Sequence, residues 1–133
     1  MKKEIINVFH IVLLLYCWKV NSQQLVQKIG DVNRLKENEA VFINKPLKDL
    51  LKEIKPEIKV AFAYNDPPLF DFRFITSEQR RKKEGNRVSL FIYVESVIDW
   101  RWDQRPIGKE TVWSNVDAKK YGNLIVTHIS IVY

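Results

Sequence analysis

The sequence predicts an α+β domain, a two-layer sandwich in which a mostly antiparallel four-stranded sheet is covered by one main amphipathic helix. Apolar residues recur at helical spacing over residues 47–54, and they then alternate with a period of two in three successive segments. Strands this close along a chain usually pair antiparallel, and a helix with one apolar face must lie against an apolar partner. The expected order is helix, three strands, short helix and strand.

The covering helix is expected between residues 44 and 55. Asn44 is a favourable N-cap, and Pro46 suits the first turn. Four apolar residues follow at the spacing of one helix face: Leu47, Leu50, Leu51 and Ile54. The residue before a proline is restricted to extended conformations, so Pro56 ends the helix.

Three strands are expected next, over residues 58–64, 70–75 and 88–95, and a last strand over residues 124–133. In the first two, larger apolar side chains occupy alternate positions, which is the period of a strand, and the third is apolar on much of both faces. We expect one face of the sheet, beneath the helix, to carry Phe62, Phe72, Leu90 and their neighbours. The main alternative is a strongly curved sheet that wraps the helix.

A capping motif predicts the second, short helix. Ser114 is followed three residues later by Asp117, which resembles a capping box. Gly122 suits the end of this helix, because glycine is favoured just after a helix terminus.

The first 22 residues have the pattern of an export signal. Lys2 and Lys3 precede an apolar run, and Val20 and Ser22 fit the two positions before a cut at Gln23. One alternative is an N-terminal membrane anchor, but the apolar stretch covers only 14 residues, whereas a spanning helix needs about 20. The other alternative is a buried helix of the domain. We expect cleavage and a periplasmic or extracellular location.

Cleavage after residue 22 leaves 111 residues, the size of one domain. Residues 23–43 form a polar lead-in, either a loose helix or a partly ordered segment, and residues 44–133 form the single α+β domain. The only cysteine, Cys17, leaves with the signal. The mature chain is therefore free of disulfides, and its stability must come from packing.

A single basic run carries the excess charge. The signal contains three lysines and one glutamate, so its removal lowers the net charge from +6 to +4, the charge of Arg80, Arg81, Lys82 and Lys83 together. A nucleic-acid binder spreads such residues over a face, so nucleic acid is not an expected partner. The run is either a solvated loop that keeps strand edges apart or a weak, salt-sensitive contact with an anionic surface.

Residues 99–103 form the most unusual local sequence. In an extended chain, Trp100 and Trp102 share one side, and Arg101 lies on the other side with two aspartates. Paired tryptophans form a platform for a partner protein or a sugar ring. The alternative is that both rings seal the edge of the core.

No catalytic, metal or cofactor site is predicted. Asp99 and Asp103 on one side of a strand lie about 13 Å apart, beyond the roughly 5–9.5 Å that separates glycosidase carboxylates. His128 is the only histidine after residue 22, and a single histidine cannot assemble a His-rich zinc site. We interpret it as a hydrogen-bonded structural residue.

These observations favour a small exported, non-enzymatic interaction module. Its partner is expected to be another envelope or extracellular protein, or a glycan. A sheet face open to solvent and flanked by aromatic residues would favour this hypothesis. A close, buried carboxylate pair in a cleft would favour the alternative of a small exported hydrolase or glycan-processing enzyme that uses Asp and Glu. A projecting charged knob would favour an enzyme inhibitor or immunity-type protein.

Overall fold

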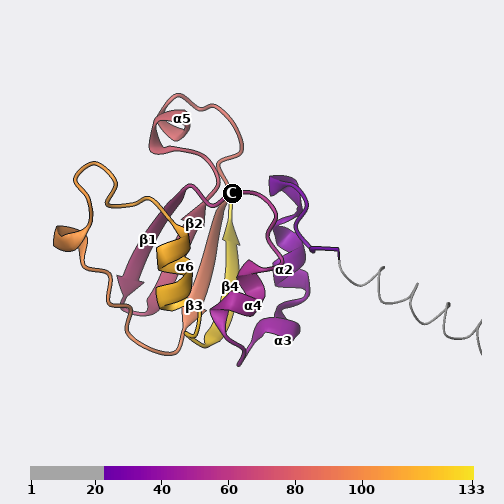
Figure 1. The fold of residues 1–133 in the computed structure, drawn as a ribbon. Helices are drawn as coiled ribbons and strands as arrows, with labels where there is room; N and C mark the ends of the chain where they lie inside the picture. Colours follow the sequence, from indigo (N-terminus) through magenta and orange to yellow (C-terminus); the bar gives the residue numbers. More distant parts are fainter. Residues whose placement is uncertain (1–22) are drawn as a thin grey trace, which may run out of the picture.

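The computed structural model describes residues 23–133, and the predicted export signal lies outside these described residues. It contains one antiparallel sheet with the strand order β1-β2-β3-β4. The strands are β1 (Val60–Asn65), β2 (Pro68–Arg73), β3 (Ser89–Val94) and β4 (Val126–Val132). Helices α4 (Leu47–Leu51) and α6 (Asn115–Tyr121) lie in front of this sheet in Figure 1. The predicted α+β sandwich is confirmed.

The register assigns each strand residue to a face, because direct cross-strand partners lie on the same side of a sheet. Two rows of partners face the helices and supply much of the core: Ala61, Phe72, Leu90 and Ile131 in one row, and Ala63, Phe70, Ile92 and Ile129 in the other.

Phe62 does not belong to these rows, so the prediction that it shares a face with Phe72 is wrong. Ala61 is the partner of Phe72, whereas Phe62 is the partner of Asp71 on the opposite face. The physical reason lies in the space above β1. The ring of Trp113 packs 4.9 Å from the ring of Phe72, and the small alanines of β1 leave room for it.

Several short helices share the cover of the sheet. Besides α4 and α6, they are the 3₁₀ helix η1 (Ile29–Asp31), α2 (Asn33–Glu37) and α3 (Glu39–Phe42). Two further helices lie in connecting loops, α5 (Ser77–Arg81) and the 3₁₀ helix η2 (Trp102–Gln104).

The helix predicted over residues 47–54 is α4, which ends earlier, at Leu51. Beyond it, the chain pairs with the N-terminal segment: Val26 N donates to Glu53 O at 2.9 Å, and Lys55 N donates to Val26 O at 2.9 Å. These backbone hydrogen bonds replace the last helical turn. Asn44, which the sequence predicted as the N-cap, has a φ of +62° and does not cap the helix. The N-cap residue of α4 is Pro46.

The segment between residues 23 and 43, for which the sequence leaves two interpretations, contributes to the core. Val26, Val32, Leu35 and Phe42 are all buried in the same hydrophobic cluster as the sheet. None of the helices in residues 23–133 has the length and apolar character needed to cross a membrane.

The capping box of the short helix is confirmed. Ser114 is the N-cap of α6; its hydroxyl accepts from Asp117 N, and its own N–H donates to the Asp117 carboxylate at 3.0 Å. Gly122 is the C-cap of the helix, and a Cβ atom there would lie 2.6 Å from Ala118 O and 3.3 Å from Lys48 Cβ. Glycine therefore permits the close approach of α6 and α4.

Candidate functional site

The second face of the sheet carries three rows of cross-strand partners, which together we call the open sheet face. They are Tyr64, Leu69, Tyr93 and His128; Phe62, Asp71, Phe91 and Ser130; and Val60, Arg73, Ser89 and Val132. Four of these residues, Val60, Leu69, Asp71 and Ser89, are buried. Within the part of the chain that the structure describes, none of the side chains of this face belongs to the main hydrophobic cluster beneath the helices or packs against it. The open sheet face is therefore a separate surface.

Four aromatic rings give the open sheet face its character. Tyr64 is 49 % exposed, and Phe62, Phe91 and Tyr93 are partly exposed. The sequence signal for this surface is the third strand, whose residues are apolar on much of both faces. Apolar side chains on both sides of a strand indicate that the second face of the sheet is also partly shielded from water or contacts a partner.

One ion pair lies among these rings. The Asp71 carboxylate is only 2 % exposed, and its cross-strand partners are Phe62 and Phe91. Arg73 donates to it through Nη2 at 2.8 Å and through Nε at 3.4 Å, and the guanidinium carbon lies 4.6 Å from the Phe62 ring centroid. The pair neutralises the buried charge, so the centre of the face is aromatic rather than acidic.

His128 closes the β4 edge of the open sheet face. Its Nδ1 lies 2.9 Å from an oxygen of Glu39 on α3, which also hydrogen-bonds with Lys36. Burial alone raises the pKa of Glu39, but hydrogen bonds from Lys36 and His128 outweigh it and hold the pKa below its ordinary value. His128 is thus tied to the helix layer, in keeping with a structural role.

The structure places Trp100 and Trp102 in different environments. Trp100 packs with Trp113, at a centroid distance of 6.5 Å and an angle of 1°, and with Tyr121 at 5.8 Å. Trp102 begins η2 and is 54 % exposed. The two rings do not form one platform, because the chain turns between them. Trp100 seals the core edge, whereas Trp102 is a separate exposed ring.

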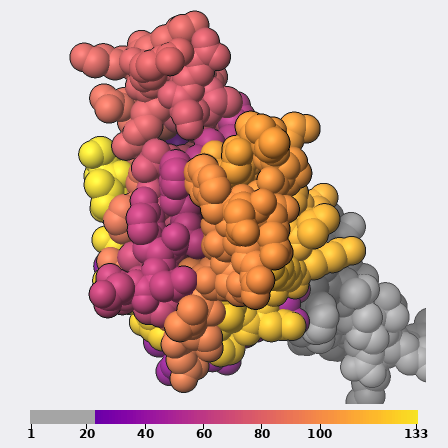
Figure 2. Space-filling model, turned by 90° about the vertical axis from the view of Figure 1, so that its left-hand side faces the viewer, coloured from indigo at the N-terminus to yellow at the C-terminus, as the bar shows by residue number. Residues whose placement is uncertain are grey.

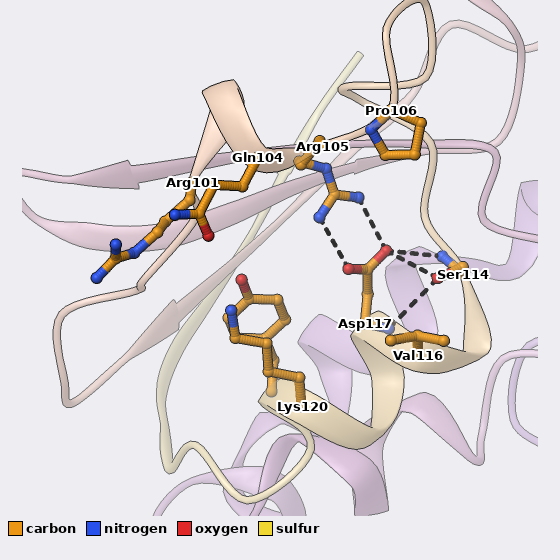
Figure 3. A pocket seen from close by; sticks show the side chains of 9 residues that line it. Arg101, Gln104, Arg105, Pro106, Ser114, Val116, Asp117 and Lys120 are labelled. Atoms are coloured by element: carbon orange, nitrogen blue, oxygen red, sulfur yellow. Dashed lines mark hydrogen bonds and ion pairs between the residues drawn. The ribbon is translucent and has the colours of Figure 1, made fainter.

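A cavity of about 380 Å³ lies beside Trp100, between η2 and α6 (Figure 3). Arg105 points into it and binds Asp117 through two hydrogen bonds of 2.9 and 3.0 Å, while Arg101 points away from that pair. At the rim, Arg101 Nε donates a hydrogen bond to the Asp99 carboxylate at 3.0 Å, and Lys120 Nζ donates to Asp99 O at 3.2 Å.

The charged groups of this cavity form ion pairs within the protein, but the buried Arg105 Nε has no hydrogen-bond partner among the described residues. Burial alone raises the pKa of Asp117, but hydrogen bonds from Arg105 and Ser114 outweigh it and lower the pKa below its ordinary value. The hydrogen bond with Asp117 raises the pKa of Arg105. The Arg105 guanidinium also lies 3.7 Å from the Trp100 ring centroid. The cluster holds the 99–113 loop in place. Sequence reasoning singled out Asp117 through its capping box, but nothing in the sequence pointed to Arg105.

The basic run contributes to a second hollow, of about 400 Å³, above the end of the sheet. Its lining consists of Arg73, Ser77, Arg80, Arg81, Lys83 and Arg87, a set that we call the basic hollow. Lys82 is not part of it and pairs with Glu78 at 3.1 Å instead. Arg73 also belongs to the open sheet face, so the two surfaces adjoin. The basic run seen in the sequence, residues 80–83, includes neither Arg73 nor Arg87, which also line the hollow.

The described cavities hold few carboxylates. The cavity beside Trp100 contains Asp117, a third one near Pro56 contains Glu57, and the basic hollow contains none. Within residues 23–133, no three His, Cys, Asp or Glu side chains are placed to hold a metal ion together.

In comparisons with known protein families, curated proteins and solved structures, the chain matched none.

Proposed function

We propose that this protein is a small exported, non-enzymatic interaction module and that the open sheet face is its contact surface. The observation that carries the proposal is the row of aromatic rings on the side of the sheet away from the described helices. Aromatic side chains are enriched in protein interfaces, since they offer a large contact area with few rotatable bonds. The N-terminal pattern supports export.

The chemistry of the face favours a protein partner with an apolar segment. Burial of one fully exposed large apolar side chain contributes about 1.5–3 kcal/mol, so the partly exposed rings together contribute favourable free energy to a contact. The neutralised Asp71–Arg73 pair adds polar groups without adding net charge. Tyr64 and Tyr93 bring hydroxyls that hydrogen-bond at a contact rim.

The enzyme alternative lacks support from the described cavities. A glycosidase needs two cooperating carboxylates, and the cavity beside Trp100 offers only Asp117, which Arg105 already holds. The other buried carboxylate, Asp71, is also held by an arginine. Neither arrangement leaves a carboxylate free to exchange a proton with a substrate.

The test uses the exported protein, purified in the form that the cell processes. Partners captured from envelope and medium fractions are identified, purified and titrated against the protein by calorimetry. We expect Tyr64→Ala/Tyr93→Ala to weaken the Kd by about tenfold or more, the loss expected when two large aromatic contacts are removed from an interface. Ile107→Ala, at a residue that is 97 % exposed on the 99–113 loop and is not part of the open sheet face, is the control and should leave the Kd unchanged. Equal affinity for all three proteins would overturn the proposal.

A second candidate is an enzyme inhibitor or immunity-type protein. The observation that favours it is the basic loop, residues 77–87, which projects from the top of the molecule in Figure 2. A projecting loop of this kind can enter an acidic cleft. In this case the captured partner is an enzyme whose activity falls when the protein is added, and Arg81→Gln relieves the inhibition.

A further inference from the structure

We propose that the basic hollow is a binding site for a phosphate group. This inference goes beyond the proposed function and does not depend on it, because the hollow is a separate site next to the open sheet face. The inference rests on the positive charge, the fixed positions and the hydrogen-bond donors of the residues that line the hollow.

Most of the cations around the hollow have no carboxylate partner among the described residues. Its five basic side chains come from β2, from α5 and from the loop that follows α5. Arg73 is paired with Asp71, but Arg80, Arg81, Lys83 and Arg87 form no ion pair with any carboxylate of the described residues. Four like charges around one hollow repel one another, and a bound dianion converts that repulsion into attraction.

The loop that carries these cations is ordered by its own contacts. Thr76 and Gln79 form a capping box at the start of α5, with hydrogen bonds of 2.9 and 3.1 Å. Gly85 has a φ of +74°, and a Cβ atom there would lie 3.0 Å from the buried side chain of Ile75. The end of the loop therefore passes close to Ile75 at its start, and this closure of the loop base holds the cations near one another before any ligand arrives.

Two of the arginines are positioned individually. Arg80 Nη1 donates to Arg87 O at 2.9 Å, which ties the start of the loop to its end. The Arg73 guanidinium is fixed between the Asp71 carboxylate and the Phe62 ring. Pre-positioned cations lose less side-chain entropy when they bind a ligand.

The donor set matches phosphate. Three of the four cations without a carboxylate partner among the described residues, Arg80, Arg81 and Arg87, are arginines, whose planar forks donate two parallel hydrogen bonds to the oxygens of one phosphate. Ser77 adds a hydroxyl at the same hollow. A phosphate group reaches this site either as a lipid headgroup or as a soluble phosphate ester, and the recognition chemistry is the same.

The experiment titrates the ¹⁵N-labelled processed protein with inorganic phosphate at constant ionic strength, with chloride as the balancing anion. We expect saturating shifts confined to Arg73 and residues 77–87. Arg81→Gln should weaken the Kd by about tenfold, since a hydrogen bond to a charged group is worth roughly one such factor. Arg87→Gln provides a second variant of the hollow, and the spectrum of each variant reports whether it is folded.

Lys82→Gln is the matched control, because it removes the same charge one residue away but lies outside the hollow. It should change the Kd by less than about twofold, as expected for an exposed charge that is screened by salt. Shifts that do not saturate, or an equal loss of affinity in Lys82→Gln and Arg81→Gln, would overturn the site in favour of diffuse attraction.

A second arm distinguishes the two sources of phosphate. Vesicles of phosphatidylcholine with and without phosphatidylglycerol are sedimented with the protein. Cosedimentation that requires phosphatidylglycerol and is reduced by Arg81→Gln but not by Lys82→Gln assigns a lipid headgroup. Saturable binding of inorganic phosphate without cosedimentation assigns a soluble phosphate ester.

Discussion

Arg105 and Asp117, twelve positions apart, form a bidentate ion pair with N···O distances of 2.9 and 3.0 Å at the start of α6. The same guanidinium donates to Val112 O at 2.8 Å and stacks on the Trp100 ring. One side chain thus joins the 99–113 loop to the helix layer, and the stability of this part of the fold depends on it.

Asp117→Asn should destabilise the protein by about 2–3 kcal/mol, because it leaves the half-buried Arg105 without its charged partner. The measurement is the free energy of unfolding from urea denaturation at pH 7. Asp103→Asn removes the same charge from an exposed position of η2 and should change this free energy by less than about 0.5 kcal/mol. Equal effects of the two substitutions would contradict the role of the pair.

The same pair predicts a dependence of stability on pH. The native pKa of Asp117 lies below its ordinary value, so its contribution is complete above about pH 4. As the pH falls through the lower native pKa, the native carboxylate takes up a proton and the contribution is lost. Glu39, whose pKa is also lowered, acts in the same direction. Urea denaturation between pH 7 and pH 3 should show falling stability, with a smaller fall in Asp117→Asn.

The faces of the sheet predict different costs for two phenylalanines. Phe72 is fully buried under the helices, so Phe72→Ala should cost about 3–5 kcal/mol in the free energy of unfolding. Phe62 is only partly buried on the open sheet face, so Phe62→Ala should cost about 1–2 kcal/mol. Both values come from the same urea titration. A cost for Phe62→Ala as large as that for Phe72→Ala would show that the open sheet face is covered.

The N-terminal pattern predicts processing at Gln23. Mass spectrometry of protein purified from the exported fraction should find Gln23 as the first residue, since Val20 and Ser22 fit the positions before the cut. An intact chain that remains with the membrane fraction would favour the N-terminal anchor instead.

Much of the fold could be predicted from local sequence. The alternation in β1, β2 and β3, and the capping box of α6, depend only on residues within a few positions of one another. The helix over residues 47–54 was predicted with the wrong end, because its last turn competes with backbone pairing to Val26, a residue far away in the chain.

The candidate surfaces were only partly predictable. Local sequence alone predicts that the third strand is apolar on much of both faces and that one loop carries a basic run. The folded chain adds that Phe62 faces away from the core and that Trp100 and Trp102 lie in different environments. It also shows that Arg73 and Arg87 line the basic hollow, whereas Lys82 does not. The physical reason is that strand register and loop closure depend on partners distant in sequence, and a shift of one residue moves a side chain to the other face of a sheet.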